Sequence, residues 1–327
     1  MPQLVGKEVG PIGFGLMGFT SRTNSCSQEQ AFAAMRAALK NGMNFWNGGE
    51  FYGTPEYNSL HLLERYFEKY PEDAGKVVLS IKGGYGPVKG PDGSPEGIRQ
   101  SLDNCLALLK GRKKIDIFEC ARRDHNTPLE VTFGVLEKEY VQTGKIGGIS
   151  LSEVKASTVH EAAKITKIVA CEVELSLWST DILENGVAAA CAQYGIPIVA
   201  YSPLGNGILT GQIKSLEDVP VDRYIHHYPR FQPDAFPINL ELVKQVESIA
   251  QKKDCKPSQL AINWTRACAK RAGTSVIPIP GAITADRVDE NAKVLELTDE
   301  DLAELDSILS KFEVIGARYP RGIPMEG

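Results

Sequence analysis

Long apolar runs are missing from this sequence. No stretch approaches the roughly 18 apolar residues of a membrane-spanning helix. The opening residues 1–10, MPQLVGKEVG, lack the apolar core of a signal peptide. We therefore expect a cytoplasmic protein that does not enter a membrane.

Metal-binding and disulfide motifs are also missing. The five histidines show no ligand spacing, and the adjacent His226 and His227 would point apart on a strand. Seven cysteines are scattered without a CxxC pair, as expected of small buried side chains in a reducing compartment. Cys120 follows a predicted strand, so a reactive thiol there is an alternative. We expect no bound metal.

An excess of positive charge is missing too. The net charge is −5, and the short basic cluster at residues 112–114 is typical of a solvated turn. No basic face for a nucleic acid is evident. The 327 residues suffice for two average domains or one large α/β barrel. Without a linker or a shift in composition, one domain, residues 1–327, is the better prediction.

Short apolar segments alternate with amphipathic ones along the chain. Each apolar segment is typical of a strand buried on both faces of a parallel sheet. The predicted strands are residues 44–47, 77–82, 115–120, 146–151, 168–175, 198–202 and 275–279, with residues 11–15 as an eighth.

Helix signals lie between these strands. Ser27 and Gln30 form a potential capping box, and Asn41-Gly42 would end that helix. Ser94-Pro95 and Thr127-Pro128 each place a cap before a proline, and Thr298 opens a last helix. Eight right-handed βα units close into an (β/α)8 TIM barrel, which is the predicted α/β fold.

Residues 13–18, GFGLMG, match the GxGxxG fingerprint of a Rossmann dinucleotide site. That motif requires a helix directly afterwards and an acidic strand end about 20 residues later. The following polar residues 19–25 begin no apolar helix, so the fingerprint is a weak indication. The glycines still suggest a backbone that lies tightly against another segment.

Several motifs together resemble the aldo-keto reductase superfamily, nearly from end to end. They are GFGLMG, GMNFWNGGEFYG, VVLSIKGG, GKIGGISLSE, CEVELSL, IPIVAYSPLGNGILTG and SVIPIPGAITADRVDEN, in that order. Within the superfamily, NFWNGGEFYG and FECARRD look most like the fungal pyridoxal reductase branch. The resemblance implies a TIM barrel, an NADP(H) cofactor and reduction of a small-molecule aldehyde or ketone. It also implies a site at the carboxyl ends of the strands.

The resemblance assigns proton donation to Tyr52 and makes Lys82 the residue that acidifies it. A phenol has a pKa of about 10, and a nearby ammonium stabilises its ionised form. In this family an aspartate usually partners the lysine, but here the residue is Asn47. Beside an amide, a partly buried Lys82 is expected to become neutral more easily. Glu50 is a possible substitute partner.

A second departure is Ala121, where the family usually has a histidine that orients the carbonyl. Alanine cannot donate a hydrogen bond but leaves room for a ring-shaped aldehyde. We expect the substrate to contact Trp46, Tyr85, Ala121 and Arg122, although Arg122 could instead be a salt-bridged surface residue. The long segment 213–237 and Trp178 are further candidates for the pocket wall.

The resemblance also implies which residues contact the cofactor. Ser152 and Glu172, in place of the usual glutamine, would bind the nicotinamide carboxamide, and Tyr201 would stack on the ring. Arg287 would pair with a 2′-phosphate. The remaining contacts would come from Gly15, Leu16 and Met17, from the loop Ser202, Pro203, Leu204, Gly205 and Gly207, and from Ile279, Pro280, Gly281, Ala282, Thr284, Glu290 and Asn291 at the adenosine end.

Three functions stay open at this point. The first is an NADPH-dependent reductase of pyridoxal, and the second is a tailoring carbonyl reductase of a fungal biosynthetic pathway. The third is a cofactor-binding regulatory subunit with little turnover, which the losses at positions 47 and 121 make conceivable. The sequence leaves the oligomeric state and the direction of reaction undetermined.

Overall fold

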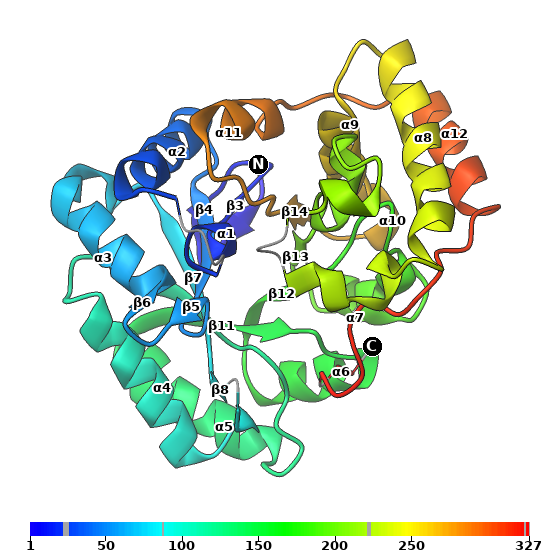
Figure 1. Cartoon of the computed structure of the whole chain (residues 1–327). Coiled ribbons are helices and arrows are strands. Elements are labelled where there is room, and N and C mark those ends of the chain that lie inside the picture. Colours follow the sequence, from blue (N-terminus) through cyan, green and yellow to red (C-terminus); the bar gives the residue numbers. More distant parts are fainter. Residues whose placement is uncertain (22–25, 87, 221–223, 324, 327) are drawn as a thin grey trace.

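The fold is a ring of parallel strands inside a ring of helices (Figure 1). The computed structural model describes residues 1–21, 26–86, 88–220, 224–323 and 325–326. The strand order is β14-β13-β12-β11-β10-β7-β4-β3, so each strand pairs with its neighbour in the chain. These strands are β3 (Phe14–Gly15), β4 (Phe45–Gly49), β7 (Val78–Gly83), β10 (Ile115–Cys120), β11 (Ile146–Ser152), β12 (Ile168–Glu174), β13 (Ile198–Tyr201) and β14 (Val276–Pro278). All eight predicted strands are confirmed.

The ring closes between its first and last strands. The amide of Gly13 donates to the carbonyl of Pro278 over 2.9 Å, and that of Gly15 to Pro280 over 3.2 Å. A Cβ on Gly15 would lie 2.9 Å from the carbonyl oxygen of Ile279. The glycines of GFGLMG therefore permit two backbones to meet at the barrel seam, and the (β/α)8 barrel replaces the Rossmann alternative.

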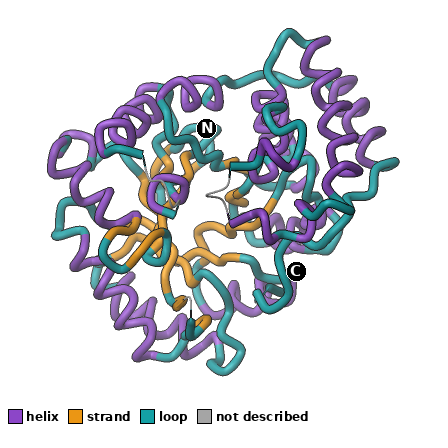
Figure 2. The backbone as a smooth tube through the Cα atoms, viewed as in Figure 1, coloured by secondary structure: helices purple, strands orange, loops and turns teal. Residues whose placement is uncertain are grey.

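Helices cover the outside of the strand ring (Figure 2). They are α2 (Gln28–Lys40), α3 (Ser59–Lys69), α4 (Pro95–Leu108), α5 (Leu129–Val135), α6 (Ala156–Ile165), α7 (Val187–Gln193), α8 (Phe236–Lys252), α9 (Pro257–Ala267), α10 (Ala269–Ala272), α11 (Ala285–Asn291) and α12 (Asp299–Leu309). A short helix α1 (Met17–Thr20) and three hairpins are also present: β1 (Gln3–Leu4) with β2 (Lys7–Glu8), β5 (Gly53–Thr54) with β6 (Tyr57–Asn58), and β8 (Tyr85–Gly86) with β9 (Gly90–Pro91). Short 3-10 and π-helical segments occur in several of the connections. No helix in the described ranges is long and apolar enough to cross a membrane.

The predicted helix caps are mostly confirmed. Ser27 accepts from the amide of Gln30 over 3.2 Å, and Ser94 caps α4 in the same way. The side chain of Gln30 does not close a capping box; it donates to the carbonyl of Ile283 over 2.9 Å, across the seam. Helix α5 begins one residue later than predicted, because Pro128 is its cap rather than its first residue.

The core has two parts because side chains alternate along each strand. Outward-facing residues pack against the helices. Inward-facing residues form a separate apolar cluster inside the barrel: Leu4, Val9, Phe45, Val78, Ile117, Ala170, Val199, Ile277 and Ile279. Two residues further along β4, β10 and β12, the inward positions are Asn47, Glu119 and Glu172. The barrel interior thus changes from apolar to polar toward the carboxyl ends of its strands.

The segment after α12 returns across the carboxyl end of the barrel (Figure 1). The guanidinium of Arg318 lies 3.1 Å from a carboxylate oxygen of Glu153 and 3.0 Å from one of Glu174. The hydroxyl of Tyr319 lies 2.9 Å from that of Tyr201. These contacts fix the C-terminal segment over the place where the family resemblance puts the active site.

Candidate active site

Tyr52 and Lys82 meet at the carboxyl end of the barrel. Strand β4 pairs with β7 so that Gly49 lies opposite Lys82, and Tyr52 follows in the turn after β4. A Cβ on Gly49 would lie 2.9 Å from the Tyr52 ring, so only glycine lets this ring fold back over the strand end. The two side chains lie close enough for the charge of Lys82 to act on the pKa of the Tyr52 phenol. The two residues on which the expected chemistry depends are therefore adjacent.

Burial dominates the ionisation of Tyr52. It raises the pKa of the phenol to about 12, although the charge of Lys82 acts in the opposite direction. The phenol is consequently protonated at neutral pH and has a proton to donate. Its backbone is held as well, since Thr20 Oγ1 and the amide of Ser59 both donate to the Tyr52 carbonyl, over 2.6 and 3.1 Å.

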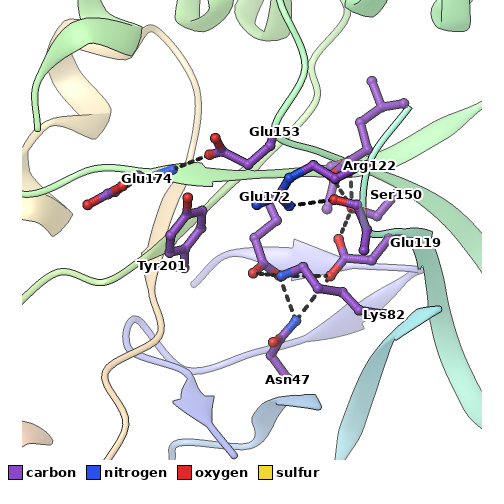
Figure 3. Close-up of polar contacts among 12 residues, drawn as sticks. Asn47, Lys82, Glu119, Arg122, Ser150, Glu153, Glu172, Glu174 and Tyr201 are labelled. Atoms are coloured by element: carbon purple, nitrogen blue, oxygen red, sulfur yellow. Dashed lines mark hydrogen bonds and ion pairs between the residues drawn. The ribbon is translucent and has the colours of Figure 1, made fainter. Parts of the chain in front are cut away.

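Below Tyr52 lies a buried group of four side chains, Asn47, Lys82, Glu119 and Glu172, which we call the lysine cluster (Figure 3). Lys82 Nζ donates to Glu172 Oε1 and lies 3.4 Å from Glu119 Oε1. Asn47 Nδ2 donates to the same two carboxylates, over 2.6 Å to Glu172 and 3.2 Å to Glu119. Two donors thus face two acidic groups.

The charges in the lysine cluster are coupled. Burial alone lowers the pKa of Lys82, but Glu119 and Glu172 outweigh it and leave that pKa raised. Burial and then Glu119 raise the pKa of Glu172 well above its usual range, against the opposing effect of Lys82. Two carboxyl groups this close do not both ionise readily. The lysine cluster therefore combines a charged ammonium with two carboxyl groups, of which Glu172 takes up a proton more readily than an ordinary glutamate.

This arrangement corrects one expectation. Asn47 does not leave Lys82 easily neutralised, because the negative charge comes from β10 and β12 instead of position 47. Glu50 is not the substitute partner: its carboxylate accepts from Ser101 Oγ over 2.5 Å and from Asn104 Nδ2 over 2.7 Å. Glu119 was missed because a glutamate inside an apolar strand gives no signal of where its side chain points.

A long cavity of about 720 Å³ opens above the lysine cluster. It runs from Tyr52 and Lys82 at one end to Arg287 at the other. Most of the expected site residues line it: Gly15, Met17, Asn47, Tyr52, Lys82, Tyr85, Ala121, Arg122, Glu172, Tyr201, Ser202, Pro203, Leu204, Gly207, Ile279, Pro280, Gly281, Ala282, Thr284, Arg287, Glu290 and Asn291.

Four expected residues lie outside this lining. Trp46 points outward and packs against Phe67, since its neighbour Asn47 takes the inward position; the expected contact between Trp46 and substrate is therefore wrong. Leu16 and Gly205 are buried in the loops beneath the cavity. Ser152 is buried, and its hydroxyl has no hydrogen-bond partner among the described residues.

The cavity wall near Tyr52 is aromatic. The ring of Phe51 lies 5.0 Å from that of Tyr52 and 5.2 Å from that of Tyr85. Tyr228 and Tyr319 add two more rings, 5.3 Å apart. Tyr228 belongs to the long segment expected to cover the pocket, whereas Phe51 and Tyr319 were missed. Nothing periodic marks the C-terminal segment, so the sequence gives no signal that Tyr319 folds back into the site.

Two residues following β10 face this region. Ala121 lines the cavity with no side-chain donor, and Arg122 lines it beside Ala121, donating to the Ala121 carbonyl over 2.6 Å. Arg122 is thus a cavity residue rather than a surface residue. Burial raises the pKa of Cys120 to about 12, so its thiol is protonated and unreactive at neutral pH. Trp178 is buried and packs edge-on against Phe231, outside the cavity lining.

The far end of the cavity carries Arg287. Its side chain is partly exposed and lies 3.1 Å from Glu290 Oε1, which also accepts from Ser258 Oγ over 2.6 Å. Thr284 caps the helix that holds Arg287. No cluster of potential metal ligands occurs within the described ranges.

Comparison with known proteins agrees with this site. The aldo/keto reductase family model matches residues 11–310. A probable pyridoxal reductase 2 of Schizosaccharomyces pombe is 42% identical, over 98% of this chain and 97% of its own length. A putative pyridoxal reductase of Saccharomyces cerevisiae is 38% identical, over 94% and 95%.

Among solved structures, the glycerol dehydrogenase AKR11B4 of Gluconobacter oxydans superposes with a TM-score of 0.81. The alignment covers 95% of both chains at 20% identity, so it supports the fold alone. The family match and the fungal relatives reach further, because they extend over nearly the whole sequence, including the segments that carry Tyr52 and Lys82. The chain belongs to the aldo/keto reductase family.

Proposed function

We propose that the protein reduces a carbonyl compound with NADPH, with pyridoxal as substrate and pyridoxine as product. The observation that supports this most directly is that Tyr52 and Lys82 line the same cavity, with Gly49, three residues before Tyr52, paired with Lys82. An acid is needed there because reduction leaves negative charge on the carbonyl oxygen.

Each residue then has a chemical task. When bound, the reduced nicotinamide supplies the hydride that reaches the carbonyl carbon. Tyr52 donates its proton to the carbonyl oxygen, and the Lys82 ammonium stabilises the phenolate that remains. Tyr201, whose ring centre lies 5.7 Å from Lys82 Nζ, is placed to support the ring of the cofactor.

The cavity fits a dinucleotide in shape and chemistry. Gly207, in the left-handed region at φ 96°, and Gly281 let the backbone line the cavity without side chains between Tyr201 and Arg287. Arg287 supports NADPH over NADH, since a guanidinium pairs well with a phosphate.

The substrate end suits a flat ring. Phe51, Tyr85 and Tyr319 offer aromatic surfaces, and the small Ala121 leaves room where a larger side chain would intrude. Arg122 offers a cation to a substrate that carries an ionised hydroxyl beside its aldehyde. The names of the two fungal relatives, both called pyridoxal reductases, agree with pyridoxal as that substrate.

The test is NADPH oxidation by the purified chain with pyridoxal, with simple aliphatic aldehydes and with no acceptor. We expect the highest kcat/KM with pyridoxal and a further preference for NADPH over NADH. Faster turnover of an unrelated bulky carbonyl would redirect the proposal to another substrate. Tight binding of NADPH without turnover of any carbonyl would overturn it in favour of a cofactor-binding protein.

A further inference from the structure

The ammonium of Lys82 is buried with two carboxyl groups in contact distance and an amide at position 47. In the described part of the chain, Glu119 and Glu172 are the acidic groups in ion-pair range of Lys82. A buried ammonium needs a counter-charge, because burial of an unpaired charge is costly. The counter-charge is therefore supplied by strands β10 and β12, opposite the strand that carries Asn47.

We infer that Glu119 and Glu172 act jointly as the positioning residues that hold Lys82 charged beneath Tyr52, and that one carboxylate of the two suffices. The inference rests on the proposed reduction, in which Lys82 stabilises the Tyr52 phenolate. It assigns to Glu172 a role toward the lysine, in place of a contact to the nicotinamide carboxamide.

The hydrogen bonds explain why an amide stands at position 47. Asn47 Nδ2 donates to both carboxylates, and the Ser150 hydroxyl lies 3.1 Å from the second oxygen of Glu119. A carboxylate at position 47 would offer no donor and would face two acidic groups. The amide and the two glutamates are thus complementary as donor and acceptors, and the ammonium of Lys82 lies in ion-pair range of both acidic groups.

The experiment is a substitution series in the full chain, with kcat, KM, NADPH affinity and the melting temperature of the cofactor-free protein as readouts. Glu119→Gln and Glu172→Gln are each expected to stay within about threefold of the parent in kcat. The double substitution removes both carboxyl groups and with them the counter-charge of Lys82. We expect it to lower kcat about tenfold or more, with KM and NADPH affinity nearly unchanged, and to lower the melting temperature by about 5 °C.

Adding Asn47→Asp to the double substitution returns one carboxylate to Lys82. The triple variant should recover most of the lost kcat and melting temperature. Aspartate and asparagine are nearly equal in size, so such a recovery would come from the charge and not from better packing. Glu139→Gln, which removes an exposed partner of Arg99 on the helical exterior, is the matched control and should behave like the parent.

Three results would overturn the inference: a large loss from Glu172→Gln alone, a double variant with parental kcat, or a folded triple variant without rescue. A loss from Glu172→Gln that appears only in NADPH affinity would restore the cofactor role. If the parent reduces no carbonyl, the proposed function fails, yet the melting temperatures still test the charge arrangement independently.

Discussion

Replacing Asn47 with aspartate tests the lysine cluster most directly. The substitution changes an amide into a carboxylate at the same size, 2.6 Å from one oxygen of Glu172 and 3.2 Å from one of Glu119. Two unit charges about 4 Å apart repel by roughly 4 kcal/mol at an effective dielectric constant of about 20. The repulsion is comparable to a large part of the total stability of a typical domain.

The folded protein can relieve this repulsion by taking up a proton. Protonating an aspartate of ordinary pKa about 3.9 costs about 1.4 kcal/mol per pH unit above that value, or about 1.5 kcal/mol at pH 5 and about 4 kcal/mol at pH 7. The new carboxyl has a raised pKa in the folded state, so its penalty is absent below pH ~4 and grows as pH rises toward that folded pKa. We expect a stability loss of about 3–4 kcal/mol at pH 7 and about 1.5 kcal/mol at pH 5.

The assay is urea unfolding of parent and variant at both pH values, with constant slopes as a check on two-state behaviour. Asn47→Leu is the control, because it removes the same hydrogen bonds without adding a charge. Its loss of stability should not grow between pH 5 and pH 7 as steeply as that of Asn47→Asp, because no new carboxyl group is added. An Asn47→Asp variant as stable as the parent at pH 7, or a penalty that does not shrink at pH 5, would refute the reasoning.

Four other outcomes follow from the described contacts. Tyr52→Phe should lower kcat by about 10²- to 10⁴-fold while NADPH affinity, followed by fluorescence, stays unchanged; retained turnover would exclude Tyr52 as the acid. Because the pKa of Tyr52 is raised to about 12, the pH profile of kcat should show no fall from tyrosine ionisation below pH ~10, and a break near pH 8 would contradict this. Arg287→Leu should weaken NADPH binding by about 10- to 100-fold and NADH binding far less, with equal losses counting against a phosphate contact. Arg318→Met leaves the buried carboxylates of Glu153 and Glu174 without this guanidinium, so unfolding measurements should give a loss of about 3–5 kcal/mol at pH 7 and less at pH 5, because burial raises the pKa of Glu174 and its carboxyl takes up a proton more readily; a loss independent of pH would point to packing instead.

The parts of the fold that were predicted from sequence are those with a local signal. Each strand of the barrel is a short apolar run, and each predicted cap lies next to the start of its helix, so neither needs knowledge of distant residues. Gln30 is the exception among the caps. Its side chain donates a hydrogen bond to the Ile283 carbonyl across the seam. No local sequence pattern predicts a partner that far away in the chain.

The site, too, has features that the sequence predicts and features that depend on distant residues. Lys82 ends one predicted strand and Tyr52 follows another by five residues, and the resemblance gives both residues roles, so their meeting was expected. The charge state of Lys82 was not, because it depends on which inward positions of β10 and β12 lie opposite each other. Trp46 and Asn47 show the effect of a one-residue step along β4. The side chain of Trp46 packs in the helix-facing core, whereas that of Asn47 points into the barrel beside Lys82.

The seam between β3 and β14 has a consequence for how the protein forms during synthesis. The first strand of the ring leaves the ribosome early, yet the strand that completes its hydrogen bonds is almost the last to appear. Until then two open edges are exposed to other chains, and Tyr319, later still, is absent from the pocket. A chain cut short before β14 is thus expected to need a chaperone rather than to survive as a smaller, working enzyme.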